Sequence, residues 1–437
     1  MKYPIDKYKS QAATTFTRLF QTYKGTTYSN SWQTGNVFDT LTDYLIRYPN
    51  ADPGSDAVLE ATLDRWRATE VSRCWYDDYG WWGIASAKAF EKRYAGIFGP
   101  TQSEFQEIAT RCWDVMHTGK PSKSYSYRGA PNVWDNRDEG STPGYFTATA
   151  TWAKPRYPGG VWQYDLFKDS RVPSKCLPGK EPDKCTFTLG EDSWSNPSDP
   201  IEYALGPFQL TVMNGLYLVL ALRLKLQNQG TATDEAINNE MGFLTNWCYD
   251  PEAKDHQLLW GQPDNNNLVR ERVGTYDYCE ELGTWPDVQH YQKEGVWCGD
   301  QGLILGGLLD YVSVDPSDPN IQPLAISIAL GVLKNMVDSD GVTPYSKHFN
   351  DHGDGDDYGC GSGVFWRYLL RGFAENAALR TELLKLVAAD PLGNPIYKSA
   401  EGTSTRIPPE NKMFADFNIL ATLTAAIEIL TVAGAGK

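Results

Sequence analysis

The sequence lacks the features that would place it in a membrane or mark it for export. Across 437 residues, no stretch of about 20 residues is both apolar and uncharged, as a membrane-spanning helix requires. The nearest candidate, Ala415–Gly434, carries Asp416 and Glu428. The first residues include no apolar segment, so no signal peptide is expected there. The chain is therefore either cytosolic or begins at a mature N-terminus.

Positive charge is also scarce. The 40 Lys and Arg residues are outnumbered by 55 Asp and Glu residues, which gives a formal net charge of −15 at pH 7. A negative field repels phosphate backbones and anionic lipids, so neither nucleic acid nor a membrane surface is an expected partner. There is no phosphate-binding Gly-x-x-x-x-Gly-Lys motif and no dinucleotide-binding fingerprint. We therefore expect no cofactor.

Metal-binding patterns are missing as well. None of the eight cysteines belongs to a Cys-x-x-Cys pair, the usual basis of a structural zinc site. His348 and His352 have zinc-like spacing, but the Glu that a zincin needs after the first His is absent. No metal site is therefore expected. Cys176 and Cys185 flank a short loop and could form a disulfide, whereas buried thiols are the alternative for most cysteines.

Helical periodicity dominates what is present. Ala12, Phe16, Leu19 and Tyr23 show the spacing of an amphipathic helix, and about twelve segments behave similarly. These segments are 12–23, 37–48, 58–66, 79–95, 101–116, 208–228, 234–248, 299–313, 321–337, 360–375, 377–390 and 411–431. Only Tyr145–Trp152 alternates like a strand. We expect a single all-α domain over residues 1–437, with two long aromatic-rich intervals, roughly 118–206 and 251–297, gathered at one end.

Asp77 and Asp78 stand out because of their neighbours. Adjacent acidic pairs are at background frequency in this composition, but this pair lies within Cys74-Trp75-Tyr76-Asp77-Asp78-Tyr79-Gly80-Trp81-Trp82. Aromatic rings stack on the C–H faces of sugars, and carboxylates bind sugar hydroxyls. Cleavage of a glycosidic bond needs one acid to protonate the leaving oxygen and another to attack or to activate water. The string alone is equally consistent with two acids that cap a helix.

The same string resembles the Asp-Asp-x-x-Trp-Trp signature of glycoside hydrolase family 76, the endo-α-1,6-mannanases. Three more segments resemble motifs of that family, in the family's order: Asn214–Arg223, Asp300–Leu308 and Gly361–Leu369. The resemblance implies an (α/α)6 barrel. It also implies a retaining hydrolase in which Asp77 is the nucleophile and Asp78 the general acid/base, with their carboxyl groups about 5–5.5 Å apart.

Other aromatic and polar residues are candidate sugar contacts. Trp162 and Gln163 lie in the first aromatic interval, where the alternative is a Trp that only fixes the loop. Trp297, Asp300 and Gln301 precede or open a helix, where the alternative is capping. The expected substrate-binding residues are Tyr76, Trp81, Trp82, Trp162, Gln163, Asn214, Trp297, Asp300 and Gln301.

Together these features predict a retaining endo-glycosidase that hydrolyses internal α-mannosidic linkages, of the α-1,6 type, in a mannan-like polysaccharide. The richness in Trp and Tyr favours an extracellular or cell-surface protein that handles glycans, expected to be a monomer. One alternative keeps the barrel but performs another reaction, as an inverting hydrolase, a polysaccharide lyase or a sugar epimerase. A second alternative is a non-catalytic protein that binds glycans or assembles cell walls.

Overall fold

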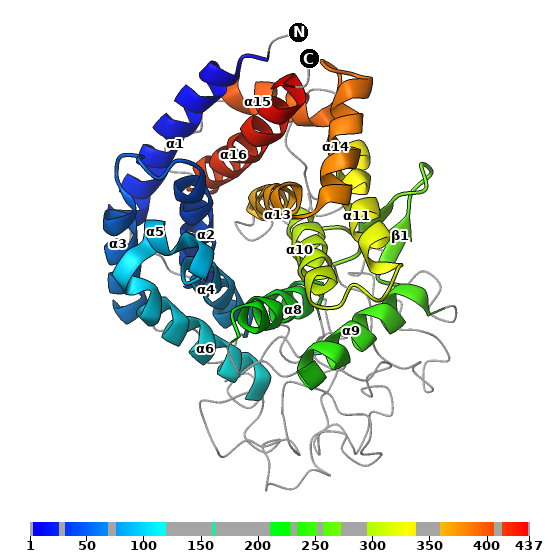
Figure 1. Ribbon diagram of the computed structural model, residues 1–437, viewed down its shortest axis with the longest axis horizontal. Coiled ribbons are helices and arrows are strands. Elements are labelled where there is room, and N and C mark those ends of the chain that lie inside the picture. Colours follow the sequence, from blue (N-terminus) through cyan, green and yellow to red (C-terminus); the bar gives the residue numbers. More distant parts are fainter. Residues whose placement is uncertain are drawn as a thin grey trace, which may run out of the picture.

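The computed structural model describes residues 3–25, 31–68, 76–118, 160–161, 210–228, 234–250, 257–271, 295–337, 359–405 and 413–435, which are mostly helical (Figure 1). The longer helices are α1 (Ile5–Gly25), α2 (Ser31–Arg47), α3 (Ser55–Ala68), α4 (Tyr76–Ala89), α6 (Gln102–Thr118), α8 (Thr211–Leu226), α9 (Asp234–Tyr249), α10 (Cys298–Val314), α11 (Ile321–Asn335), α13 (Gly361–Glu375), α14 (Ala377–Ala389), α15 (Pro395–Thr405) and α16 (Met413–Ala435). Short turns of helix are η1 (Lys92–Tyr94), α5 (Ala95–Phe98) and η2 (Gly99–Thr101). Strands β1 (Leu259–Gly261) and β2 (Asn267–Val269) form an antiparallel hairpin.

The helices form two concentric layers. In the inner layer, α2, α4, α8, α10, α13 and α16 each pack against the next, and α16 closes the ring on α2. In the outer layer, α1 packs on α16, α6 on α4, α9 on α8, α11 on α10, and α14 and α15 on α16 (Figure 1). Helix α3 packs on α2 in the same outer layer, and outer and inner helices alternate along the chain except that α14 and α15 are both outer. This is the (α/α)6 barrel that the family resemblance implied.

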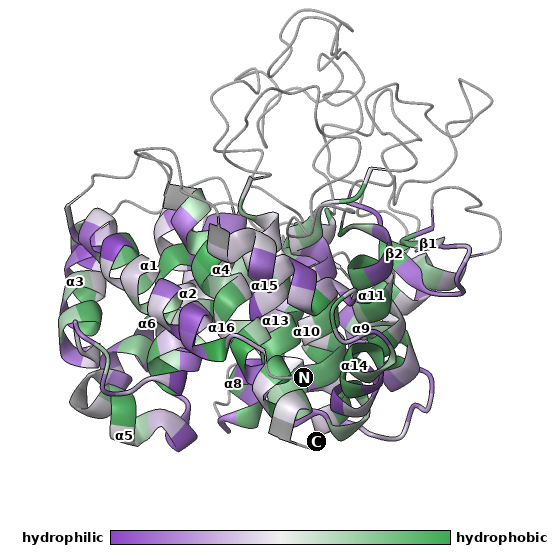
Figure 2. Ribbon diagram, turned by 90° about the horizontal axis from the view of Figure 1, so that it is seen from above, coloured by the Kyte–Doolittle hydropathy of each residue, from purple (hydrophilic) through white to green (hydrophobic). Residues whose placement is uncertain are grey.

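Burial explains why some helices show a clear apolar stripe and others do not. The outer helix α1 buries one face, through residues spaced three and four apart: Tyr8, Ala12, Thr15, Phe16, Leu19, Phe20 and Tyr23. The inner helix α8 is buried on every side from Thr211 to Leu224, and α10 from Cys298 to Asp310. A helix enclosed all round needs apolar residues all round. Figure 2 shows hydrophobic segments through the centre of the helical layer and hydrophilic ones on peripheral elements such as α3.

Contacts between neighbouring inner helices show that these helices run parallel. A Cβ atom on Gly80 of α4 would lie 2.8 Å from Leu216 of α8, and one on Gly83 would lie 2.5 Å from Leu220. The contact moves forward from Gly80 to Gly83 on α4 and from Leu216 to Leu220 on α8. The two helices therefore run in the same direction. Gly302 of α10 approaches the backbone of α13 most closely, because its Cβ would lie 2.8 Å from the Cα of Phe365. The inner helices therefore begin at the same end of the barrel.

One inner helix has the composition of a membrane span. Among the described residues, Ala415–Gly434 within α16 is long and apolar enough to cross a membrane, but 67% of it is buried inside the protein. The helix packs against α1, α2, α13 and α15. Its place in the core of the barrel accounts for its apolar composition.

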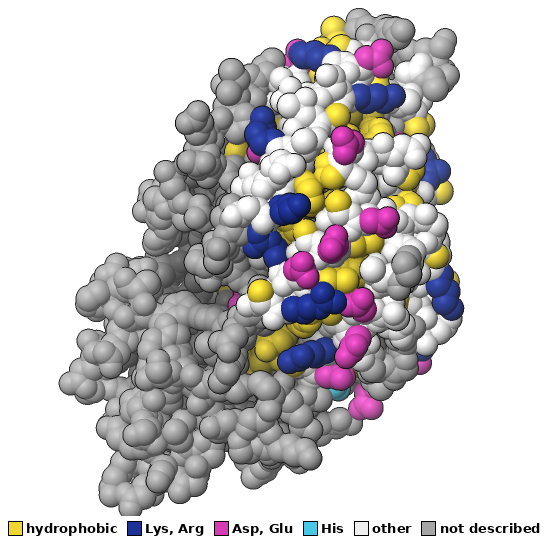
Figure 3. Space-filling view, turned by 90° about the vertical axis from the view of Figure 1, so that its left-hand side faces the viewer, with side chains coloured by type: hydrophobic (Ala, Val, Ile, Leu, Met, Phe, Trp, Pro, Cys, Tyr) yellow, Lys and Arg dark blue, Asp and Glu magenta, His cyan; other side chains and the backbone are white. Residues whose placement is uncertain are grey.

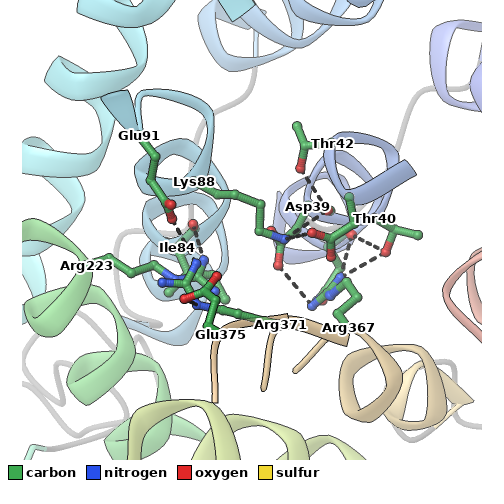
Figure 4. Close-up of polar contacts among 12 residues, drawn as sticks. Asp39, Thr40, Thr42, Ile84, Lys88, Glu91, Arg223, Arg367, Arg371 and Glu375 are labelled. Carbon is green, nitrogen blue, oxygen red and sulfur yellow. Dashed lines mark hydrogen bonds and ion pairs between the residues drawn. The ribbon is translucent and has the colours of Figure 1, made fainter. Parts of the chain in front are cut away.

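A network of buried charges joins the inner helices from the middle of the ring towards their C-terminal ends (Figure 4). Lys88 of α4 pairs with Asp39 (2.5 Å) and Asp43 (2.8 Å) of α2, and Arg367 of α13 pairs with Asp39 at 3.3 Å. Arg367 also donates to the backbone oxygen of Asn36 (2.8 Å). Burial raises the pKa of Asp39, but Lys88 and Arg367 outweigh burial and hold that pKa well below its ordinary value. The carboxylate is therefore charged in the native state.

A second cluster extends the network to α8 and α10. Arg371 of α13 pairs with Asp310 of α10 (3.0 Å) and with Glu91, just beyond α4 (2.8 Å). Arg223 of α8 donates to the backbone oxygen of Ile84 at 2.7 Å and pairs with Asp310 at 3.9 Å. All these side chains are largely or fully buried. Five of the six inner helices are thus linked by ion pairs that water screens weakly.

Outer surfaces carry charge differently. Over the face formed by α1, α3 and α6, Lys and Arg are interspersed with Asp and Glu (Figure 3). Arg67 of α3, for example, pairs with Asp64 on its own helix and with Glu104 of α6, and all three side chains are exposed. Exposed pairs of this kind contribute about 0–1 kcal/mol each.

The sequence-based elements agree with the structure in most of the described residues, but two features were not predicted. Helix α15 begins at Pro395 and lies in a stretch with few large apolar residues. The β1–β2 hairpin lies within an interval expected to lack regular structure, and its strands have only three residues each. Tyr145–Trp152 and the Cys176–Cys185 loop lie outside the described residues.

Replacing Gly302 with Ala should destabilise the barrel, because the new methyl group would meet the backbone of α13. We expect the free energy of unfolding to fall by about 1–3 kcal/mol. Gly242 of α9 is the matched control: it is exposed and helical, with no atom within 4 Å of its Cβ position. Gly242→Ala should stabilise by about 0.5–1 kcal/mol. Denaturant titration measures both, and equal effects of the two substitutions would contradict the close packing.

Replacing Lys88 with Met should also destabilise the protein strongly, because it leaves two buried carboxylates short of a partner. We expect a loss of about 3–5 kcal/mol. The matched control is Lys385→Met, which breaks an exposed pair with Glu382 and should change stability by less than about 1 kcal/mol.

The pH dependence of the Lys88→Met effect follows from the lowered pKa of Asp39. The stabilisation from this carboxylate is present above its unfolded pKa of about 3.9 and is lost as pH falls towards the folded pKa. The penalty of Lys88→Met should therefore shrink below about pH 4. Unfolding titrations at pH 3 and pH 7 compare the two regimes, and a penalty that grew in acid would contradict the assignment.

Candidate functional site

Asp77 and Asp78 lie in the first turn of α4, at the end of the barrel where inner helices begin. Asp78 is 7% exposed, Asp77 is half-buried, and the Oδ1 atom of Asp77 is shielded from solvent. The N-terminus of a helix carries partial positive charge and stabilises carboxylates placed there. The same location serves both a helix cap and a pair of reacting acids.

Two of the aromatic neighbours belong to the core. Tyr76 is 2% exposed, and Trp82 has no exposed surface. The Trp82 ring meets Trp66 of α3 edge to face, with 5.1 Å between ring centroids. Trp82 therefore packs inner helix α4 against the outer layer, and the structure does not present it as the exposed sugar-stacking surface that the sequence suggested. Its position six residues into α4 turns its ring away from the barrel interior.

Trp81 and Trp297 instead meet inside the inner ring. Their ring centroids are 6.3 Å apart and their planes nearly perpendicular. The two residues come from α4 and from the start of α10, which are separated in the ring by α8. A Cβ atom on Gly361 would lie 2.5 Å from the Trp297 Nε1 atom, so the glycine leaves room for the indole. Trp81 is one helical turn beyond Asp77 in α4, Trp297 immediately precedes α10, and both rings are largely buried.

Asn214 and Gln301 hold backbone groups. The Asn214 side chain accepts from the backbone N–H of Val161 (2.8 Å) and donates to the backbone oxygen of Leu210 (2.7 Å). The Gln301 side chain accepts from the N–H of Val269 (2.7 Å) and donates to the oxygens of Val269 (2.6 Å) and Trp297 (3.1 Å).

Both amides are fully buried. These contacts use both ends of each amide, and both N–H bonds of the Gln301 amide. In the structure, both side chains hold backbone groups at the start of α8 and α10, and their contact with sugar stays a prediction.

Asp300 is also fully buried, in the first turn of α10. Burial raises the pKa of the nearby Cys298 thiol well above its ordinary value, and Asp300 and Cys360 raise that pKa further. Cys112 and Cys248, elsewhere in the core, are free thiols, and burial raises the pKa of Cys248 to about 12. For these two the buried-thiol alternative holds.

Trp162 and Gln163 lie outside the described residues, as does the acidic segment 351–357. Within the part of the chain that the structure describes, no three His, Cys, Asp or Glu side chains are grouped so that they could hold a metal ion.

Sequence reasoning missed the segment 257–271, which contains the β1–β2 hairpin. Thr211, the first residue of α8, donates through its hydroxyl to the backbone oxygen of Arg270 (2.7 Å). The backbone N–H of Glu271 donates to Gly295 (3.3 Å), close to the start of α10. The segment thus crosses the ends of two inner helices. The run Asp264-Asn265-Asn266, where Asn265 has φ 62°, is the turn signal that could have revealed it.

Comparison with solved structures assigns the fold to a class: it is the fold of the family 76 glycoside hydrolases. No protein-family model matches the sequence, and no curated protein matches it.

Two of the similar structures illustrate the class. The α-1,6-mannanase of Salegentibacter sp. HEL1_6 has a TM-score of 0.56 over 97% of this chain and 99% of its own, at 14% identity. The Dfg5 protein of Chaetomium thermophilum, solved in complex with glucosamine, also has a TM-score of 0.56, over 99% of this chain and 93% of its own, at 13% identity.

A variant of the same Salegentibacter mannanase is also similar in structure. It has two adjacent aspartates replaced by asparagine, is described as inactive, and was solved with α-1,6-mannotriose. Its TM-score is 0.53 over 96% of this chain and 98% of its own, at 14% identity. At such identities the likeness establishes the fold.

Proposed function

We propose that this chain is a retaining endo-glycosidase that hydrolyses internal α-1,6-mannosidic linkages of a mannan-type polysaccharide. It acts as a single-domain monomer, at the cell surface or outside the cell. The observation that carries the proposal is the placement of Asp77 and Asp78 in the first turn of an inner helix. The barrel has the fold of enzymes that include one inactivated at two adjacent aspartates.

In the first step, Asp77 attacks the anomeric carbon of the sugar while Asp78 donates a proton to the leaving glycosidic oxygen. A covalent glycosyl ester forms on Asp77 and the glycosidic bond breaks. The half-buried nucleophile, with Oδ1 shielded from solvent, and the largely buried acid suit this division of work. Their shielding strengthens electrostatic interactions with the positive charge that develops on the sugar ring.

In the second step, Asp78 removes a proton from water, which attacks the anomeric carbon and releases Asp77. Two inversions give net retention of configuration. Trp81, one turn along α4, and Trp297 contribute a largely buried aromatic pair at the same end of the barrel.

A second substrate follows from the glucosamine bound in the Dfg5 structure. The same pair could cleave a glycan that contains an amino sugar. Incubation with a panel of α-1,6-mannan, other α-mannans and glucosamine-containing glycans, followed by product mapping, distinguishes the two. Oligosaccharide products from α-1,6-mannan support the main proposal, and cleavage restricted to the amino-sugar glycan supports the second.

Replacing either aspartate by asparagine should lower kcat by about a thousandfold or more, since each substitution removes a reacting group. The free energy of unfolding should change by less than about 1 kcal/mol, because only a charge at a helix end is lost. Asp56→Asn is the matched control, since Asp56 lies in the first turn of the outer helix α3. It should leave kcat unchanged. Full activity of Asp77→Asn or Asp78→Asn would refute the assignment.

The roles of the two acids can be separated with azide and an aryl α-mannobioside whose leaving group needs no proton. In Asp78→Ala, azide should replace water in the second step and give a glycosyl azide of retained configuration. In Asp77→Ala, azide should replace the nucleophile and give the inverted azide. NMR of the products reads the configuration. Exchanged outcomes would reverse the two roles, and an inverted sugar from the wild-type enzyme would indicate an inverting hydrolase.

A further inference from the structure

Two buried side-chain amides make the same kind of hydrogen bonds to backbone groups at the end of the barrel where the aspartates lie. Asn214 is the fourth residue of α8, and Gln301 is the fourth residue of α10. Each donates to the backbone oxygen of the residue four positions earlier, at 2.7 Å and 3.1 Å. Each also accepts a backbone N–H from a separate segment of the chain, that of Val161 for Asn214 and that of Val269 for Gln301.

The two segments, 160–161 and 257–271, are called the rim segments below. Gln301 holds its rim segment as a neighbouring strand would, because it bonds both the N–H and the C=O of Val269. Thr211 and Gly295 hold the residues that follow, Arg270 and Glu271. On the outer side, Asn267 donates to Ser327 of α11 at 2.9 Å. The position of the second rim segment is thus fixed from inside and outside the barrel.

The amides lie at the height of the catalytic pair. Gly80 of α4 packs against Leu216 of α8, and the two helices are parallel. Moving two residues back along each helix brings Asp78 and Asn214 to the same level. Gln301 reaches the site by another route, because it bonds the backbone oxygen of Trp297, and the ring of that residue contacts Trp81.

We propose that Asn214 and Gln301 are positioning residues for glycan binding. They fix the two rim segments over the starts of α8 and α10, and so set the groove in which a polysaccharide lies against Asp77 and Asp78. This role rests on the proposed glycosidase function. The side-chain hydrogen bonds of the two residues go to backbone groups, so the two residues act on how the substrate is held rather than on the bonds that break.

The test compares Gln301→Met and Asn214→Leu, which keep side-chain size and remove the amide, with Asn394→Leu. Asn394 is a matched control: it is 2% exposed, donates to two backbone oxygens and accepts the N–H of Tyr397 at 2.9 Å, but lies at the start of α15. Gln301→Glu, which retains an acceptor and loses the donor, serves as a milder variant if the Met variant does not fold.

Using α-1,6-mannan as the substrate, we expect KM to rise about tenfold in the Gln301 and Asn214 variants, since a lost anchor is equivalent to one or two hydrogen bonds. We expect kcat to stay within about threefold, with an unchanged pH profile. Asn394→Leu should lose comparable thermal stability without a change in KM. An unchanged KM in both site variants, or a loss confined to kcat, would overturn the proposal.

Hydrogen exchange gives a readout that needs no turnover. In the wild-type protein, the Val269 amide should exchange slowly. In Gln301→Met it should exchange about tenfold faster or more, while amides in the middle of α10 keep their wild-type rates. If the Val269 amide exchanged at the same rate in Gln301→Met as in the wild-type protein, the anchoring would be refuted even if the enzyme were active. Absence of any glycan turnover by the wild-type protein would refute the proposed function instead, and exchange would still decide the anchoring.

Discussion

The parallel packing of the inner helices is the constraint on which the rest of this structure depends. Because these helices begin at one end, residues in their first turns come together although they are far apart in the chain: Asp77 and Asp78 on α4, Asn214 on α8, and Asp300 and Gln301 on α10. The positive ends of several helices also meet there, and this favours carboxylates. Close contacts such as Gly302 against Phe365 keep the ring tight.

Two levels of the barrel are held together in different ways. At the end where the helices begin, amides and a hydroxyl hold backbone segments, and the rings of Trp81 and Trp297 contact each other. From the middle of the ring towards the C-terminal ends of the helices, buried ion pairs such as Lys88–Asp39 and Arg371–Asp310 join helix to helix. Ion pairs of this kind cost desolvation, so their contribution lies in fixing which helices meet rather than in large net stability. Because these pairs hold the helices together farther along the ring, the first turns of the inner helices are left for the site.

Much of the fold was accessible from the sequence because the patterns are local. Outer helices such as α1 showed a stripe, and the inner helices α8 and α10 were apolar throughout. Helix α15 was not predicted, because its start at Pro395 is followed by few large apolar residues. The β1–β2 hairpin was not predicted, because strands of three residues are too short to show alternation of apolar and polar side chains.

The site was accessible only in part. The string around Asp77 and Asp78 identified the carboxylates, but sequence does not say what a buried side chain touches. Gln301 and Asn214 were therefore expected to bind sugar, and Trp82 to stack on it, whereas the first two bind backbone and the third packs on Trp66. The ion-pair network joins residues more than 300 positions apart, as Asp39 and Arg367 are. Its one local sign was a charge such as Arg223 inside an apolar helix.

The proposed mechanism requires a covalent bond between Asp77 and the anomeric carbon of a mannosyl unit. The most direct test is to trap this species with a fluorinated mannosyl fluoride that forms the ester quickly and hydrolyses slowly, and to locate it by peptide mass spectrometry. We expect one added sugar residue per protein, carried by the peptide that contains Asp77, and no added mass on the Asp77→Asn variant. A labelled residue elsewhere, or turnover of mannan by a protein that never carries the sugar, would contradict this mechanism.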